Sequence, residues 1–156
     1  MSGNWQLRID ERLIHGQVVL GCCLSARIRC MVLLDDSIAD SSFEQELYSL
    51  GIEQEQKLEF LTVAECARRM QSPPDENTLV VMRSPGEALE LLRQGAPIRR
   101  ITVGGLHYRQ GARRLLDYLH VTPEDEAALR ELLAAGVAIE ARQVPAAEGI
   151  NLANLL

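Results

Sequence analysis

Lysine is almost absent from the 156-residue sequence, because Lys57 is the only one and arginine carries the remaining positive charge. Aromatic residues make up 4% of the chain and its net charge is −6, so we expect no nucleic-acid partner. No apolar run reaches the length of a membrane span, and residues 1–10 lack the pattern of a signal peptide. These absences together predict a cytoplasmic protein.

Motifs for nucleotides and metals are missing as well. The sequence contains neither GxGxxG nor GxxxxGK[ST], which argues against a nucleotide-binding enzyme. The cysteines lie in apolar segments without CxxC spacing, so we interpret them as core residues: Cys22, Cys23, Cys30 and Cys66. We predict no metal site and no cofactor.

A receiver-type domain, phosphorylated on aspartate, is one alternative to consider. Asp35 and Asp36 follow an apolar run, and paired carboxylates of this kind bind magnesium. A receiver also needs a lysine at the end of a late strand, whereas residues 101–104 contain none and Lys57 precedes the third predicted strand. The lysine content therefore argues against this alternative.

The organisation of the chain indicates one α/β domain over residues 1–156, since 47% of its residues are hydrophobic. Alternating apolar runs and amphipathic stretches predict a mainly parallel central sheet of about seven strands, one of them antiparallel, with helices on both faces. Residues 104–116 break the alternation and form either a long loop or an antiparallel excursion. The predicted strands are Trp5–Asp10, Met31–Asp35, Leu58–Leu61, Thr78–Arg83, Ile98–Val103, Asp117–Val121 and Val137–Val144.

Capping residues predict where the helices begin and end. A hydroxyl side chain or a proline marks four starts, at Ser37, at Thr62 with Glu65 completing a capping box, at Ser84-Pro85 and at Thr122-Pro123. Glycines follow the ends of three helices, at Gly51, Gly95 and Gly136.

Residues 8–17, with the sequence RIDERLIHGQ, are the most informative stretch. Arg8 and Asp10 interrupt a buried strand on the same side, which is costly unless the two charges pair with each other or serve a function. His15 follows in the connection to the next helix, directly before Gly16. A phosphate on this histidine would face free backbone N–H groups and the positive end of the helix dipole.

Histidine suits a phosphoryl relay because its neutral ring nitrogen is nucleophilic at cellular pH. Arg12 lies three residues before His15, where its guanidinium can stabilise the transferred phosphoryl group, and Asp10 can orient the imidazole or Arg12. A structural histidine remains the alternative if the residue is considered alone.

The full run of residues 8–18 favours the phosphoryl relay over a structural histidine. Its sequence, RIDERLIHGQV, closely resembles the signature of IIB proteins of the mannose, fructose and sorbose family of the phosphoenolpyruvate-dependent sugar phosphotransferase system. The resemblance continues in LDDSIA at 34–39, SP at 84–85, TVGG at 102–105, TPED at 122–125 and VP at 144–145. Family members usually carry a tryptophan shortly after Gly-Gln-Val, where this chain has Leu20–Cys23. We expect that change to affect the surface that meets a partner.

The resemblance implies a phosphocarrier. His15 would be phosphorylated, through Nδ1, by a phosphohistidine of a IIA protein, and would pass the group to a sugar bound by membrane IIC and IID subunits. Arg12 and Asp10 would support that chemistry, and the protein would associate transiently with the inner face of the membrane. A regulatory phosphohistidine protein without a transport role would need the same site, so it stays an alternative, as does a homo-oligomer.

Further candidates surround this site. Arg8, Gly16, Gln17 and Arg83 are predicted to bind phosphate, with a solvated side chain as the alternative for Arg83. Asp35 and Asp36 either bond the first loop or cap the next helix. Gly104-Gly105 forms either a turn or a pair of anion-binding N–H groups, and His107 and His120 have no comparable context.

Overall fold

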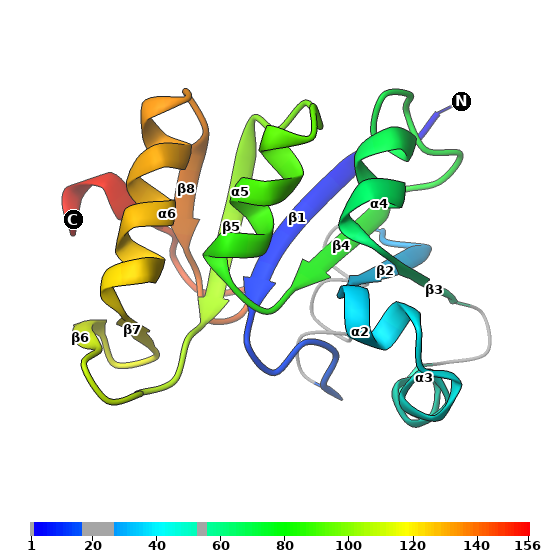
Figure 1. The fold of residues 1–156 in the computed structure, drawn as a ribbon, viewed down its shortest axis with the longest axis horizontal. Coiled ribbons are helices and arrows are strands. Elements are labelled where there is room, and N and C mark those ends of the chain that lie inside the picture. The colour runs from blue at the N-terminus through cyan, green and yellow to red at the C-terminus, as the bar shows by residue number, and fades with distance from the viewer. Residues whose placement is uncertain (1, 17–26, 53–55) are drawn as a thin grey trace.

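The computed structural model describes residues 2–16, 27–52 and 56–156, and within them a seven-stranded sheet runs through the molecule (Figure 1). The strand order is β3-β2-β4-β1-β5-β8-β9, and all neighbours pair in parallel except β8 and β9. The mainly parallel sheet with one antiparallel strand is thus confirmed. The strands are β1 (Trp5–Asp10), β2 (Cys30–Leu34), β3 (Lys57–Leu61), β4 (Thr78–Met82), β5 (Arg100–Gly105), β8 (Ala138–Ala141) and β9 (Ile150–Asn151).

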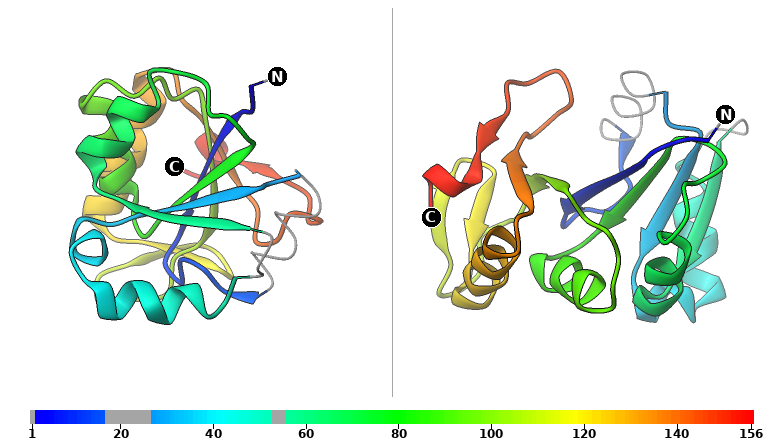
Figure 2. Two further views of the ribbon diagram at one scale, coloured as in Figure 1. Left: turned by 90° about the vertical axis from the view of Figure 1, so that its right-hand side faces the viewer. Right: turned by 90° about the horizontal axis from the view of Figure 1, so that it is seen from above.

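Helices cover both faces of this sheet. The helices α4 (Val63–Arg69), α5 (Pro85–Arg93) and α6 (Pro123–Ala134) lie side by side on one face (Figures 1 and 2). The other face packs against Ile38 of α2 (Asp36–Ala39) and Tyr48 of α3 (Ser42–Ser49). A 3₁₀ turn, η1 (Leu152–Asn154), follows β9. The helix expected after Gly16 lies outside the described residues.

One predicted strand belongs elsewhere. Residues 117–121 were expected in the main sheet, but β7 (Leu119–Val121) instead pairs antiparallel with β6 (Arg113–Leu116) in a separate two-stranded sheet. The antiparallel alternative for residues 104–116 is therefore correct for their second half. The seventh place in the main sheet goes to β9, whose two residues are too few to give a recognisable alternation.

The helix caps follow the predictions with three corrections. Asp35, rather than Ser37, caps α2 by accepting the backbone N–H groups of Ser37 and Ile38. The hydroxyl of Thr62 accepts the N–H of Glu65, but the reciprocal bond of a capping box forms only at Thr122 and Asp125, so the predicted box at Thr62 is incomplete. Among the predicted end glycines, Gly95 and Gly136 have positive φ, and Gly51 does not.

Alternation along β1 separates two cores. Leu7 and Ile9 face α4, α5 and α6 in the larger core cluster. The opposite face carries a second core cluster, which includes Leu13, Met31, Leu33, Ile38 and Val81. Arg8 and Asp10 point to that opposite side, so both charged residues are buried without entering the larger core.

The two cysteines of the described residues fit their interpretation as core residues. Cys30 and Cys66 are buried and free, and burial raises the pKa of the Cys66 thiol to about 12. An unreactive thiol is the result. Within the described ranges no cluster of metal-ligating side chains forms, and no helix is long and apolar enough to cross a membrane.

Candidate functional site

Asp10, the last residue of β1, organises the charged groups at the carboxyl edge of the sheet. Its side chain is fully buried, and its Oδ2 lies 3.3 Å from the guanidinium of Arg8. Arg12 donates to the same carboxylate through its backbone N–H at 3.1 Å and through Nε at 3.3 Å. The predicted pairing of Arg8 with Asp10 is therefore present, and it includes Arg12 as a second cation.

The chain turns sharply after Asp10 and holds that turn with an apolar anchor. The N–H of Leu13 donates to the carbonyl of Asp10 at 2.9 Å, and Leu13 has a φ of 57°. A leucine in this left-handed region costs about 1 kcal/mol or more, so surrounding contacts must compensate. The Leu13 side chain is fully buried in the second core cluster, and that burial fixes the backbone leading to His15.

His15 packs one edge of its ring against Asp10. Its Nε2 is buried and lies 3.6 Å from Oδ2 of Asp10, while 24% of the side chain remains exposed. Burial lowers the pKa of His15; Asp10 raises it, Arg12 lowers it, and the net result is below the ordinary value. The imidazole is therefore neutral at neutral pH and keeps a nucleophilic lone pair.

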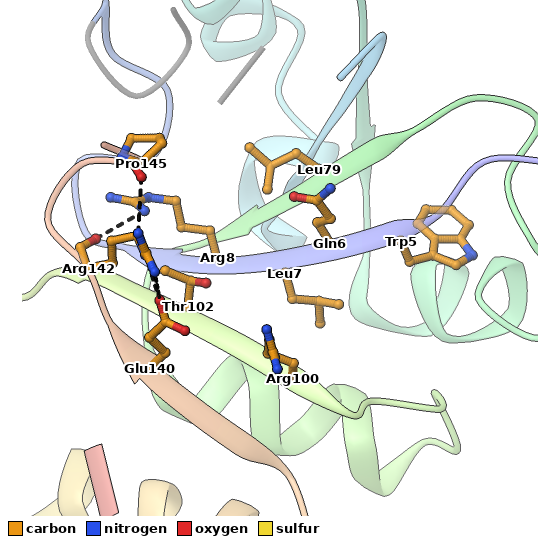
Figure 3. Close-up of a pocket in the computed structure, with 10 residues that line it drawn as sticks. All are labelled: Trp5, Gln6, Leu7, Arg8, Leu79, Arg100, Thr102, Glu140, Arg142 and Pro145. Carbon is orange, nitrogen blue, oxygen red and sulfur yellow. Dashed lines mark hydrogen bonds and ion pairs between the residues drawn. The ribbon is translucent and has the colours of Figure 1, made fainter. Parts of the chain in front are cut away.

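Arg8 is held by the segment that follows β8, through its bond to Arg142 (Figure 3). Only 3% of its side chain is exposed, and it donates to the carbonyls of Arg142 at 3.3 Å and Gln143 at 2.8 Å. A Cβ atom at Gly104 would lie 1.9 Å from this guanidinium, so Gly104 provides the space that Arg8 occupies. Gly104 and Gly105 are the last two residues of β5, so the expectation of a turn there is wrong.

These contacts indicate that Arg8 positions Asp10. A cavity of about 400 Å³ lies along the same face of the sheet, with Arg8 at one end and Trp5 at the other (Figure 3). Phosphate binding by Arg8 stays a prediction. Arg12, whose side chain is 39% exposed, is the guanidinium of this group that a phosphoryl donor can approach.

Arg83 belongs to a second charged group at the same edge. It follows β4 and lies 3.7 Å from Asp35, the residue that caps α2. Burial raises the pKa of Asp35, but bonds from Ser37 and Ile38 together with Arg83 bring it below its ordinary value. Glu87 has the opposite shift, because burial and the charge of Asp35 raise its pKa to about 7.

Glu11 is a residue of the site that the sequence analysis did not identify. Its carboxylate accepts the backbone N–H of His107 at 2.8 Å and Nε of Arg109 at 3.0 Å, and its own N–H donates to Gly105 at 2.9 Å. Burial raises the pKa of Glu11, but the bonds from Arg109 and His107 lower it by more, so the pKa lies below its ordinary value. Glu11 therefore ties the loop after β5 to the loop that carries His15.

The remaining predicted phosphate ligands are Gly16 and Gln17. Among the described residues, a Cβ atom at Gly16 would meet no atom within 4 Å apart from its chain neighbours. Gln17 and the helix that would present its N–H groups lie outside the described residues, as does the segment Leu20–Cys23 that replaces the family tryptophan.

Comparison with known proteins decides the family. Residues 5–156 match the family model described as PTS system sorbose subfamily IIB component. The chain belongs to this family. It is 31% identical over 150 residues to an Escherichia coli protein named N-acetylgalactosamine-specific phosphotransferase enzyme IIB component 2, covering 96% of both chains.

Two further relatives carry IIB in their names, and one of them has a solved structure. The crystal structure of the IIBSor domain of the sorbose permease from Klebsiella pneumoniae superposes with a TM-score of 0.88 at 25% identity, covering 97% of this chain and 94% of that one. The mannose-specific EIIAB component of Escherichia coli is 25% identical over 96% of this chain, which spans 47% of that protein.

As a IIB component, the chain is a phosphotransferase that carries phosphoryl groups in sugar uptake. IIA and membrane IIC and IID components, with a sugar substrate, are the partners that this family implies. Family membership also decides against the receiver-type alternative, and Asp35 accordingly serves as a helix cap.

Proposed function

We propose that His15 is the residue of this IIB component that carries the phosphoryl group, with residues 1–156 acting as one domain. One observation carries the proposal: the buried carboxylate of Asp10 lies between Arg8 and Arg12 and meets Nε2 of His15. Because Nε2 faces Asp10, Nδ1 is the ring nitrogen available for bonding to phosphorus.

In the first step, the lone pair on Nδ1 of His15 attacks the phosphorus of a phosphohistidine on the IIA protein. The new N–P bond forms as the donor's N–P bond breaks, and the donor nitrogen recovers its electron pair. Arg12 stabilises the charge on the equatorial oxygens, and the Asp10 carboxylate stabilises the positive charge on the imidazole. In the second step, a sugar hydroxyl oxygen forms an O–P bond as the N–P bond of His15 breaks. The hydroxyl proton leaves to solvent, Nδ1 recovers its electron pair, and His15 is neutral again.

The partners follow from the relatives. The mannose-specific relative combines IIA and IIB in its name, and this chain matches 47% of it, which supports a IIA protein as donor. We propose IIC and IID membrane subunits as the site of sugar transfer, with the chain in the cytoplasm and in transient contact with the membrane. The sugars to test first are N-acetylgalactosamine, mannose, sorbose and fructose, which are named for relatives.

The phosphate ligands form the less direct part of the proposal. No atom of the described residues, apart from its chain neighbours, lies within 4 Å of where a Cβ of Gly16 would be, which supports the approach of phosphoryl oxygens there, and Gln17 follows it directly in the sequence. Arg83 directly follows β4, whose last residue, Met82, pairs with Ile9 of β1, so it lies just beyond the end of the strand next to β1. Its present partner is Asp35.

The central test is transfer of labelled phosphate from phosphoenolpyruvate through the general carrier proteins and a IIA protein. We expect acid-labile, alkali-stable label on His15, and no label on His15→Ala. The variants His107→Ala and His120→Ala serve as matched controls and should be labelled like the wild type. Labelling of His15→Ala at the wild-type rate would refute the proposal.

Arg12 provides the second test. With 39% of its side chain exposed, Arg12→Ala should fold, while label transfer to His15 should slow by about 100-fold through lost transition-state stabilisation. Arg12→Lys should recover only part of that rate, because lysine cannot reproduce the planar guanidinium. A melting curve that shows collapse of Arg12→Ala would instead assign Arg12 a structural role.

A further inference from the structure

Helix α3 presents an apolar face to solvent close to the phosphorylation site. Phe43, Leu47 and Leu50 are 70%, 53% and 83% exposed, and their spacing of four and three residues places them on one side of the helix. We call these three residues the α3 stripe. Contiguous exposed apolar side chains of this size mark interaction surfaces in proteins that otherwise bury them.

The inner side of α3 connects the stripe to the loop that carries His15. Tyr48 packs against the second core cluster, which also contains Leu13, and Ile14 packs there as well. Figure 1 and the left view of Figure 2 show α3 and the loop after β1 together below the sheet. A partner that reaches His15 from this side therefore meets the α3 stripe.

Acidic residues without an ion pair among the described residues lie on α3 and just before it. The sequence between Arg29 and Lys57 contains seven acidic residues and no lysine or arginine. Within the described part of the chain, no ion pair involves Asp40, Glu44 or Glu46.

On the opposite side of the loop that carries His15, the charged side chains are paired. The arginines between β5 and β7 each have a carboxylate partner in the chain itself: Arg109 pairs with Glu11, Arg113 with Glu126 and Arg114 with Asp117. Unneutralised charge is therefore found beside α3, and its sign is negative. A complementary partner surface is basic.

We infer that the α3 stripe docks on basic cytoplasmic loops of the membrane IIC and IID subunits; this inference rests on the proposed function. Cytoplasmic loops of membrane proteins carry an excess of lysine and arginine, which complements Asp40, Glu44 and Glu46. Bare anionic lipid would be repelled by the same residues. Transfer to a membrane-bound sugar requires that the edge around His15 face these subunits.

The test uses inside-out vesicles that carry IIC and IID, with phosphorylated full-length chain as the varied reactant and labelled sugar as acceptor. The double variant Phe43→Ser, Leu50→Ser should raise the KM for the chain about tenfold and leave kcat within about twofold, since only docking area is lost. Ile150→Ser, at an exposed apolar side chain on β9, is the matched control and should leave KM unchanged.

Charge reversal tests whether the acidic residues beside the α3 stripe contribute to docking. Glu44→Lys with Glu46→Lys should raise the same KM, and added salt should reduce the difference from the wild type because screening weakens the attraction. Glu148→Lys is the matched control, an exposed acidic residue in the segment before β9.

Four readouts would overturn the inference. An unchanged KM in the stripe variant would do so, and binding of the wild type to protein-free anionic vesicles would assign the surface to lipid. An equal loss in membrane-free labelling by IIA would assign it to the donor, and a wild-type dimer that the variant abolishes would assign it to a second copy. Failure of wild-type His15 to take label at all would instead refute the proposed function.

Discussion

Asp10 ends β1 and Asp35 directly follows β2 at the same edge of the sheet, yet their side chains serve different purposes. Asp10 is completely buried, binds two arginines and meets His15. Asp35 accepts three hydrogen bonds from Ser37 and Ile38 at the start of α2 and pairs with a single arginine, Arg83. The strand end brings a carboxylate to the edge in both cases.

The backbone path after each strand explains the difference. After β2, a helix begins at once and its free N–H groups take up the carboxylate of Asp35. After β1, the turn at Leu13 removes the chain from a helical path, so Asp10 accepts one local backbone N–H, that of Arg12, and its carboxylate remains available to side chains. A carboxylate at a strand end is therefore a better functional candidate where side chains, rather than the N–H groups of a following helix, are its main partners.

The largest expected effect comes from neutralising Asp10. Asp10→Asn leaves Arg8 buried without a counter-charge, which should lower the free energy of unfolding by about 3 kcal/mol in urea titrations. Because Asp10 raises the pKa of His15, the NMR titration midpoint of His15 should fall further in this variant, and label transfer should slow.

A double variant keeps this prediction testable if Asp10→Asn does not fold. Arg8→Met combined with Asp10→Asn removes the unpaired charge and should recover most of the lost stability, while His15 should stay poorly labelled. Full labelling of the double variant would show that Asp10 serves stability alone.

An intermediate effect is expected at the other aspartate. Asp35→Ala removes the cap of α2 and should cost about 1–2 kcal/mol in the same urea assay, with His15 labelled within about twofold of the wild-type rate. Asp35→Asn, which can still cap, should lose less. A labelling defect as large as that of Asp10→Asn would erase the distinction between the two carboxylates.

The smallest effect should appear at Glu87, whose pKa of about 7 lies above the ordinary 4.5. The native state binds the proton of Glu87 more tightly than the unfolded chain does. The contribution of this proton to the free energy of unfolding is therefore complete below about pH 4.5 and is lost as the pH rises through about 7. Glu87→Gln should therefore gain about 1 kcal/mol over the wild type between about pH 5 and 8, after allowance for partial exposure. Urea titrations with identical pH slopes for both proteins would contradict this.

Sequence patterns predicted the fold where local chemistry decides it. The bounds of β1 and the shared side of Arg8 and Asp10 follow from strand alternation, and Pro85 and Pro123 mark helix starts by fixed backbone geometry. Ser37 and Asp35 were both predicted as caps of α2, because both side chains accept hydrogen bonds and lie two residues apart, and Asp35 is the cap. Only the backbone path selects between them.

Long-range contacts were beyond the reach of those patterns. Glu11 bonds the chain at His107 and Arg109, close to a hundred positions later, and no local spacing signals that pairing. Gly104 was interpreted as a turn residue because glycine is common in turns, whereas it is needed to make room for the Arg8 guanidinium. His15, Arg12 and Asp10 lie within six residues, which is why the sequence brought them together.

The bonds of Arg8 to the carbonyls of Arg142 and Gln143 also bear on synthesis of the protein. They join positions 134 and 135 residues apart, so the support behind Asp10 is completed only after residues 142 and 143 have been synthesised. A nascent chain can pair β1 with β4 long before that moment. The fold thus makes the setting of Asp10 depend on synthesis through residue 143, long after the strand that carries it has formed.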